Sequence, residues 1–219
     1  VLPVQGPPGT GKSFTGARAI VTLSKAGKRI GVTAVSHKVI ENLLLKVDEA
    51  AQEEGLTIGL AQQVNADPSG AITSTKNFQD SLTQLDSGSV VGGVAWAWTH
   101  DDAIGQLDYL FVDEAGQISL AQTLAMARAA KNLVRLGDPQ QLEQPSKGAH
   151  PDGADIAALA HIVGPDQATL RPEQGLFLEQ TWRMHPNLAA FTSELYYDNK
   201  LRSHPDCAKQ RIDGTGVAD

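Results

Sequence analysis

A stretch near the start of the chain has the residue types and spacing that hold a phosphate, and we call it the phosphate loop: Gly6, Pro7, Pro8, Gly9, Thr10, Gly11, Lys12 and Ser13. It matches the pattern G-x-x-x-x-G-K-[ST] between an apolar run and a helical pattern, the context that this pattern needs. Its glycines let backbone N–H groups converge on phosphate oxygens, and the following helix turns its positive dipole end to the same anion. Lys12 would reach the β- and γ-phosphates of ATP and Ser13 would ligate Mg²⁺. The alternative is a chance Gly-Pro turn ahead of a helix.

Two acids, Asp113 and Glu114, directly follow a second apolar run, Tyr109–Val112. At such a strand end the first carboxylate can hold Mg²⁺ and the second can orient the attacking water. We therefore predict Asp113 as a metal ligand and Glu114 as the general base. Adjacent acids at a strand end are also common on surfaces, so the pair gains its meaning from following the phosphate loop in the chain.

Two later segments carry groups that could sense a phosphate. Gly137–Leu142 follows the apolar run Leu133–Leu136, and a carboxamide there would lie at the ligand-binding edge of a parallel sheet. Arg183 precedes a helical pattern that begins with Pro186, and it could supply positive charge to the transferring phosphoryl group. A Gly-Asp-Pro turn made for chain reversal and a solvated arginine are the alternatives that the sequence leaves open.

Trp96 and Trp98 stand two residues apart after the β-rich run Ser89–Ala95. In an extended chain both rings would lie on one side, as suits stacking on the bases of a single strand. They could equally be core aromatics, and the sequence does not decide between the two.

The elements that must position these residues alternate between short β-rich runs and amphipathic stretches, which predicts an α/β fold with a mainly parallel sheet flanked by helices. The predicted strands are Leu2–Gln5, Arg29–Ala34, Ser89–Ala95, Tyr109–Val112, Leu133–Leu136 and Leu176–Glu179. The predicted helices are Gly11–Lys25, Ser36–Glu53, Ile118–Ala130, Ala154–Ile162 and Pro186–Tyr196. We expect an irregular excursion over residues 55–86 with one helix around 76–85, and a loop around one helix over 144–172.

Composition limits the class of protein. The 219 residues suit one α/β domain, or one domain with a fragment of a second, and they contain no apolar run of the roughly 20 residues that span a membrane. The single cysteine, Cys207, favours a reducing, cytoplasmic location. The net charge of −7 means that any contact with nucleic acid must be local. The chain opens on Val1 without a basic leader, so we expect a piece of a longer protein.

Four segments in this order resemble the superfamily 1 helicases of the branch that includes the RNA-decay helicase and the senataxin- and Dna-two-like enzymes: Gly6–Lys12, Asp113–Ala115, Gly137–Leu142 and Arg183–Pro186. The resemblance spans Gln5 to Pro186. The run Gly31–Ile40, with Trp182 where that branch usually has Tyr, looks most like large bacterial proteins that join a RecB-like nuclease to such a helicase.

The resemblance implies roles that spacing alone does not show. It implies that Gln141 contacts the γ-phosphate and that Arg183 engages it from a second RecA-like domain, while Trp182 stacks on the nucleotide base. It implies that Ser36 and His37 contact the single strand, together with the loop that carries the two tryptophans.

The resemblance also implies a RecA-like, ATP-binding motor domain over residues 1–175 and the incomplete start of a second over 176–219. The expected function is an ATP-driven helicase or translocase on single-stranded DNA, or RNA, with a second motor domain and a RecB-like nuclease module in the full-length chain. This piece is expected to bind nucleotide better than it hydrolyses it. The alternatives are a P-loop ATPase that remodels protein and a scaffold that binds nucleotide without hydrolysis.

Overall fold

The computed structural model describes residues 1–64, 70–142 and 156–211. Its strands are β1 (Leu2–Gln5), β2 (Ile30–Thr33), β3 (Leu60–Gln63), β4 (Ile72–Thr75), β5 (Val90–Gly92), β6 (Leu107–Val112), β7 (Ala130–Gly137), β8 (Leu176–Phe177), β9 (Gln180–Thr181) and β10 (Arg202–Ser203). Its α-helices are α1 (Lys12–Lys25), α2 (His37–Glu53), α3 (Phe78–Leu82), α4 (Leu120–Ala127), α5 (Ala158–Val163) and α6 (Pro186–Tyr196).

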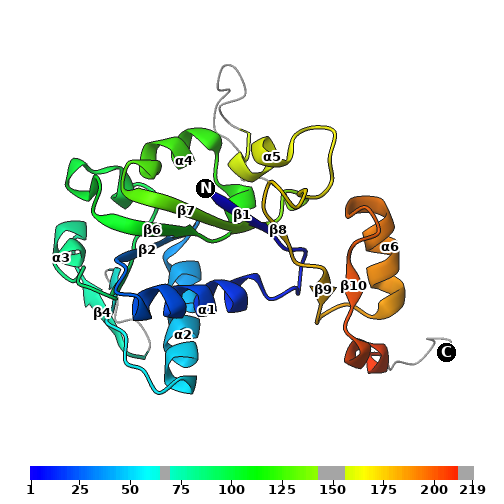
Figure 1. The fold of residues 1–219 in the computed structure, drawn as a ribbon, viewed down its shortest axis with the longest axis horizontal. Helices are drawn as coiled ribbons and strands as arrows, with labels where there is room; N and C mark the ends of the chain where they lie inside the picture. Colours follow the sequence, from blue (N-terminus) through cyan, green and yellow to red (C-terminus); the bar gives the residue numbers. More distant parts are fainter. Residues whose placement is uncertain (65–69, 143–155, 212–219) are drawn as a thin grey trace.

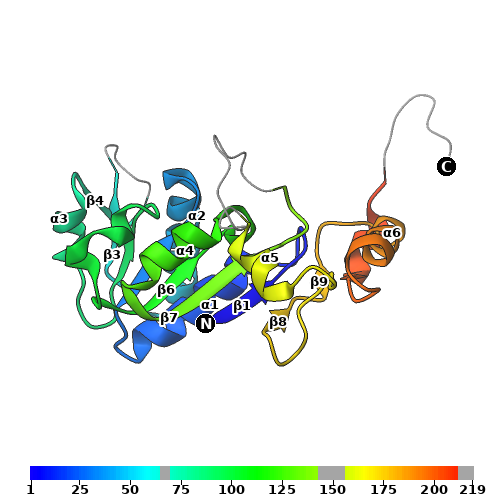
Figure 2. The ribbon, with the colours of Figure 1, turned by 90° about the horizontal axis from the view of Figure 1, so that it is seen from above.

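Eight of the strands form one parallel sheet in the order β4-β3-β5-β2-β6-β7-β1-β8. Helices α1 and α2 cover one face of it, and α4 and α5 lie over the other (Figure 1). Strands β9 and β10 form a separate parallel pair next to α6, at the end of the molecule away from β4 (Figure 2). This arrangement confirms the predicted α/β class with a mainly parallel sheet.

Local sequence explains where several helices begin. The Ser36 side chain caps α2 by accepting a hydrogen bond from the backbone N–H of Val39 at 3.3 Å. Ser119 and Gln122 form a reciprocal capping box at the start of α4. Pro186 occupies the first turn of α6, where its missing N–H costs nothing.

The core consists of two apolar clusters, one on each face of the sheet. The first joins α1 and α2 to the sheet through residues such as Ile20, Leu44 and Phe111. The second includes Trp98 and Met126. Within the described part of the chain no helix is both long and apolar enough to cross a membrane.

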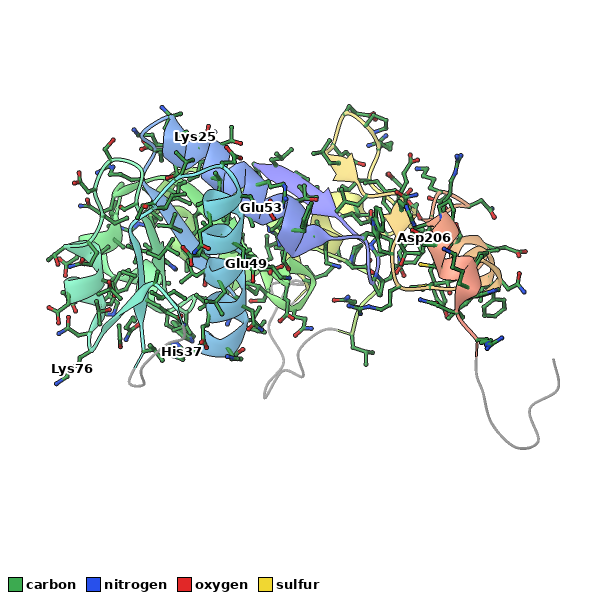
Figure 3. All side chains as sticks on the ribbon, turned by 90° about the horizontal axis from the view of Figure 1, so that it is seen from below. Lys25, His37, Glu49, Glu53, Lys76 and Asp206 are labelled. Atoms are coloured by element: carbon green, nitrogen blue, oxygen red, sulfur yellow. The ribbon has the colours of Figure 1, made fainter. Side chains whose placement is uncertain are left out.

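Helix α2 carries the acidic residues at its carboxyl-terminal end toward solvent. Glu53 pairs with Arg18 of α1 at 2.6 Å, and Glu54 pairs with Lys25. Figure 3 shows Glu49 and Glu53 along this helix, with His37 at its opposite end. The charges therefore form a solvated face that also ties α2 to α1.

Some predicted elements were wrong. Residues 55–86 are not merely irregular, because they contain β3 and β4, which extend the sheet beyond β5. The predicted helix Ile118–Ala130 ends at Ala127, because Ala130 already pairs with Leu107 in the sheet. Part of the loop and helix predicted after residue 143, including Ala154, lies outside the described residues.

The strand predicted at Leu176–Glu179 is shorter, Leu176–Phe177, and lies at the edge of the main sheet. Residues Leu176 and Phe177 pair with Val4 and Gln5 of β1, so β8 extends the first sheet. The separate pair of strands begins only at Gln180. Pro3 is tolerated in β1 because the ladder to β8 starts one residue after it.

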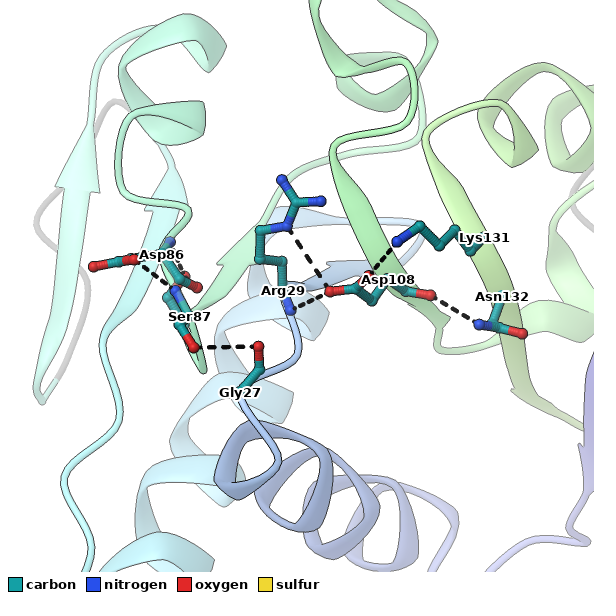
Figure 4. A network of polar contacts seen from close by, with 8 residues as sticks. Gly27, Arg29, Asp86, Ser87, Asp108, Lys131 and Asn132 are labelled. Carbon is teal, nitrogen blue, oxygen red and sulfur yellow. Dashed lines mark hydrogen bonds and ion pairs between the residues drawn. The ribbon is translucent and has the colours of Figure 1, made fainter.

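At the amino-terminal edge of the sheet, Asp108 connects β6 to β7 and to the residue before β2 (Figure 4). Its carboxylate accepts hydrogen bonds from the Lys131 ammonium at 2.8 Å and from the Arg29 backbone N–H at 3.0 Å. The Asn132 carboxamide donates to the Asp108 carbonyl at 3.1 Å. The hydrogen bond from Lys131, followed by that from Arg29, holds the pKa of the Asp108 carboxyl below its ordinary value.

We predict that Asp108→Asn lowers the free energy of unfolding by about 1 kcal/mol at neutral pH, the upper range for a surface ion pair. Because the folded pKa is depressed, the ionised carboxylate stabilises the fold above the ordinary pKa of about 3.9, and this contribution is lost as pH falls through the lower folded value. Urea denaturation of both proteins at a series of pH values measures the difference, which should shrink below about pH 4. A difference that stays constant down to acid pH would contradict this account.

Candidate functional site

The phosphate loop connects β1 to α1 at the carboxyl edge of the sheet. The Gly6 N–H donates to the Gly137 carbonyl of β7 at 2.9 Å, which fixes the start of the loop against the neighbouring strand. Gly9 and Gly11 adopt φ values of 79° and 78°, which favour glycine. The Thr10 hydroxyl donates to the Pro7 carbonyl at 2.8 Å and closes the turn. The loop thus has the strand-loop-helix setting that its sequence predicts.

Lys12 lies half-buried at the first residue of α1, among charged groups from several elements. Its ammonium donates to the carbonyls of Gly6 and, at 3.4 Å, Pro7. Burial lowers the pKa of Lys12, while the negative charges of Asp138 and then Asp113 act in the opposite direction. A half-buried lysine whose ammonium is bonded to backbone carbonyls is suited to exchange those partners for phosphate oxygens.

Asp113 is buried at the end of β6, with 4% of its surface exposed. Its carboxylate accepts a hydrogen bond from the Ser13 hydroxyl at 3.1 Å and another from the Glu114 backbone N–H at 2.9 Å. Burial raises the pKa of Asp113 above its ordinary value. A cation would offset the cost of ionising this carboxylate.

The oxygens of Ser13 and Asp113 fit a Mg²⁺ ion, which is usually held by one or two protein oxygens together with substrate phosphates and water. Among residues 1–64, 70–142 and 156–211 no group of three or more His, Cys, Asp or Glu side chains could hold a metal ion by itself. The ion would therefore take its remaining ligands from a nucleotide and from water.

Glu114 follows in a left-handed backbone conformation with φ 53°, which is uncommon for a residue other than glycine. It begins a 3₁₀ turn, Ala115–Gln117, that bends the chain away from β6. Burial, and then the nearby Asp113 charge, raise the pKa of the Glu114 carboxyl, which makes it a stronger proton acceptor when ionised.

Two features of β7 and its surroundings hold that turn in place. A Cβ on Gly116 would lie 2.3 Å from the Asp138 carbonyl, so only glycine allows this close approach. The buried Arg135 guanidinium donates to the Ala115 carbonyl at 3.4 Å, and burial lowers the pKa of Arg135 to about 10. Arg135 therefore packs directly beneath the turn that carries Glu114.

The segment that carries Trp182 and Arg183 rests on the phosphate loop. The Trp182 N–H donates to the Gly9 carbonyl at 2.9 Å, and the Thr181 hydroxyl donates to the Pro8 carbonyl at 3.0 Å. A Cβ on Gly9 would lie 2.5 Å from the Arg183 Cβ, so the loop approaches this segment as closely as a glycine permits.

The side chains of Trp182 and Arg183 are both exposed. One face of the Trp182 indole stacks on the His204 ring, with 3.7 Å between centroids and 19° between planes. Arg183 is near enough to Lys12 to disfavour its charged form. The structure thus gathers Lys12, Ser13, Asp113, Glu114 and Arg183 around one loop.

Strand β7 contributes a residue that sequence reasoning missed. Asp138 is fully buried directly after β7, and it is the strongest negative neighbour of Lys12. The predicted sensor Gln141 lies in the following turn, where its N–H donates to the Asp138 carbonyl at 3.2 Å. The signal for Asp138 is an acid at a strand end, but the sequence Gly-Asp-Pro also fits a simple turn.

Of the predicted contacts with a nucleic acid strand, Ser36 and His37 lie at the start of α2, and both are exposed. The Ser36 hydroxyl already accepts the capping hydrogen bond from Val39, and the His37 carbonyl accepts one from the Gln62 carboxamide at 2.8 Å. His37 therefore offers its imidazole, and Ser36 a hydroxyl proton, to a ligand on this edge.

The sequence left open whether Trp96 and Trp98 form a stacking platform or belong to the core, and the structure separates the two rings. The chain after β5 is not extended, because it turns into the 3₁₀ helix Ala97–Thr99. Trp98 is 1% exposed, donates its indole N–H to the Gly93 carbonyl at 3.1 Å and packs edge-on against Phe78 at 4.9 Å. Trp96 is 69% exposed. Of these two tryptophans, only Trp96 is exposed enough to stack on a base of a nucleic acid strand.

We predict that Trp98→Ala lowers the free energy of unfolding by about 3–5 kcal/mol, because it opens a cavity in the core. Trp96→Ala should change it by no more than about 0.5 kcal/mol. Denaturant titration of the two variants beside the parent chain measures both. Equal losses would show that the two rings share one environment, contrary to the structure.

A protein-family model described as an AAA domain matches residues 1–162. The chain belongs to this AAA domain family. The match covers the phosphate loop, both acids that follow β6 and the turn after β7. Three of the site segments thus lie within the AAA domain, and the segment with Trp182 and Arg183 lies beyond the matched residues.

Curated relatives of this AAA domain include nucleic-acid enzymes. The DNA replication ATP-dependent helicase/nuclease DNA2 of Saccharomyces cerevisiae is 28% identical over 207 residues, which are 91% of this chain and 13% of that protein. The protein of the same name from Gallus gallus is 28% identical over 221 residues, 95% of this chain and 21% of its own length. The ATP-dependent helicase NAM7 of Saccharomyces cerevisiae is 23% identical over 238 residues, which are 91% of this chain and 24% of that protein. The chain thus spans about a quarter or less of these relatives.

Among solved structures, arterivirus nonstructural protein 10, a helicase in complex with DNA, superposes with a TM-score of 0.58. It is 14% identical, and the match covers 93% of this chain and 41% of that one. At this identity the similarity concerns the fold, and it agrees with a RecA-like arrangement of the sheet and helices.

Proposed function

We propose that this chain is the ATP-binding part of a superfamily 1 helicase or translocase that moves along single-stranded DNA. The observation that carries the proposal is the convergence of Lys12, Ser13, Asp113 and Glu114 at one sheet edge, with Arg183 laid on the same loop. The similarity to helicase/nucleases named for DNA replication supports DNA as the nucleic acid and a nuclease module in the same full-length protein.

In this proposal each side chain has one task. Lys12 binds the β- and γ-phosphates, Ser13 and Asp113 hold Mg²⁺, and Glu114 accepts a proton from the attacking water. The ion neutralises charge on the phosphates when it is bound. Arg183 adds positive charge near the γ-phosphate, and the free face of the Trp182 indole stacks on the base.

We also propose two motor domains, with the boundary after β8 rather than before it. The separate strand pair and α6 support the second, because α6 exposes an apolar stripe of three side chains, Leu188, Phe191 and Leu195, each more than half exposed. Such a stripe usually packs against further structure. Residues 1–219 alone would therefore bind nucleotide yet hydrolyse it slowly, since Arg183 is held by only part of its domain.

Two other functions remain candidates for testing. A P-loop ATPase that remodels protein would need the phosphate loop and Glu114, but not an exposed Trp96 that can stack on the bases of a single strand. A scaffold that only binds nucleotide would not need Glu114 as a general base. The remodelling ATPase predicts an ATPase rate that single-stranded DNA leaves unchanged, and the scaffold predicts no hydrolysis.

The proposal is tested by ATP hydrolysis of the full-length protein with and without single-stranded DNA. We expect DNA to stimulate hydrolysis in the parent protein, and Lys12→Ala to abolish hydrolysis and weaken ATP binding at least about 100-fold, because it removes the cation aimed at the phosphates. Calorimetry measures the binding. Unchanged ATP affinity in Lys12→Ala would overturn the site, and an ATPase indifferent to DNA would favour the alternatives.

The division of roles between the two acids is tested separately. We expect Glu114→Gln to keep Mg²⁺-ATP binding and to slow hydrolysis at least about 100-fold, the usual scale for a general base. Asp113→Asn should instead weaken the Mg²⁺-dependent part of binding. A Mg²⁺ titration of nucleotide affinity in both variants separates the two, and identical curves would show that the roles are wrongly divided.

A further inference from the structure

A buried polar network joins the phosphate loop to the end of α6. Gln5, the last residue of β1, is fully buried, and its carboxamide donates to the Ala168 carbonyl at 2.9 Å and accepts from the Leu170 N–H at 2.7 Å. Burial raises the pKa of Asp138, and the nearby Gln5 carboxamide is among the groups that act in the opposite direction. The residue before the loop and the acid that faces Lys12 thus share one network.

Tyr197, the residue after α6, closes this network from the other side. Its phenol donates to the Asp138 carboxylate at 2.7 Å, and only 3% of the residue is exposed. Its ring lies 6.2 Å from that of Phe177 in β8. Burial, and then the Asp138 charge, raise the pKa of Tyr197, so the phenol stays protonated and remains a donor.

The turn after Tyr197 adds a second connection to the main sheet. Asp198 accepts a hydrogen bond from the Thr169 hydroxyl at 2.6 Å, and the Lys200 ammonium donates to the same hydroxyl at 2.6 Å. The chain then returns through β10, where the His204 N–H donates to the Thr181 carbonyl at 2.8 Å. The segment that follows Tyr197 thus connects the loop before β8 to the strand pair.

We propose that Tyr197 is a positioning residue: its hydrogen bond to Asp138 sets the strand pair so that Trp182 and Arg183 reach a nucleotide on the phosphate loop. This inference rests on the proposed nucleotide site. Asp138 also faces Lys12, so one carboxylate links the lysine that binds phosphate to the segment that carries the arginine. A buried network whose polar groups all have partners favours one arrangement, because a buried polar group without a partner is costly in free energy.

The test uses a double-mutant cycle in the 219-residue chain. Tyr197→Phe removes only the hydroxyl, and Tyr196→Phe makes the same change at a neighbouring, half-exposed tyrosine as the matched control. Each is made in the parent chain and in a Trp182→Ala, Arg183→Ala background. Calorimetry with Mg²⁺ and a non-hydrolysable ATP analogue gives the affinities, and non-additivity reports coupling between the positions.

We expect Tyr197→Phe to weaken binding of the analogue roughly tenfold, the scale of one hydrogen bond to a charged group, and Tyr196→Phe to leave it unchanged. The loss should disappear in the Trp182→Ala, Arg183→Ala background. An equal loss in both backgrounds, or no loss, would overturn the positioning role while leaving the nucleotide site intact. If the parent chain failed to bind the analogue, the proposed function itself would fail.

Hydrogen exchange provides a readout that does not depend on nucleotide. The Trp182 N–H is bonded to the Gly9 carbonyl, so Tyr197→Phe should speed exchange in residues 180–184 while β1 and α1 keep the protection of the parent. Faster exchange throughout the chain would mean that the hydroxyl only stabilises the fold, and this too would overturn the proposal.

Discussion

The burial of the Lys12 ammonium is the constraint on which the site depends. A cation that loses water must be compensated, and here the compensating acids come from the ends of two different strands, Asp113 after β6 and Asp138 after β7. Only a sheet in which β6, β7 and β1 are neighbours brings these ends beside the loop that follows β1. The strand order, the glycine at position 116 and the buried Arg135 all serve this convergence, because each keeps the turns after β6 and β7 close together.

The sequence predicts best those elements whose bounds depend on a few neighbouring residues. The bounds of β1 and α6 match the expectation, since an apolar run before glycines and a Pro at a helix start are both unambiguous. The grouping of the phosphate loop with Asp113 and Glu114 follows as well, because the carboxyl ends of parallel strands meet at one edge.

The features that the sequence does not predict depend on contacts between residues that are far apart in the chain. Strands β3 and β4 are four residues each, LAQQ and ITST, without a continuous apolar run. They form because β5 offers a partner edge to β3, and β3 in turn offers one to β4. Trp96 and Trp98 point to different environments because a 3₁₀ turn replaces the extended strand. A spacing of two residues puts side chains on one side only in an extended chain. The hydrogen bond between Tyr197 and Asp138 spans 59 positions, so no local pattern signals it.

The two sheets meet through a junction that differs in kind from either core. Thr181 and Trp182 touch backbone carbonyls of the phosphate loop, and Tyr197 touches a buried carboxylate, whereas each core is held by apolar side chains. Hydrogen bonds are directional, so a small rotation of one sheet against the other would break these bonds together. Because the partners on the loop side are the carbonyls of Pro8 and Gly9, any ligand that reshapes this loop also changes what the junction can hold. The loop whose sequence predicts a phosphate site is thus also the support on which the segment with Arg183 rests.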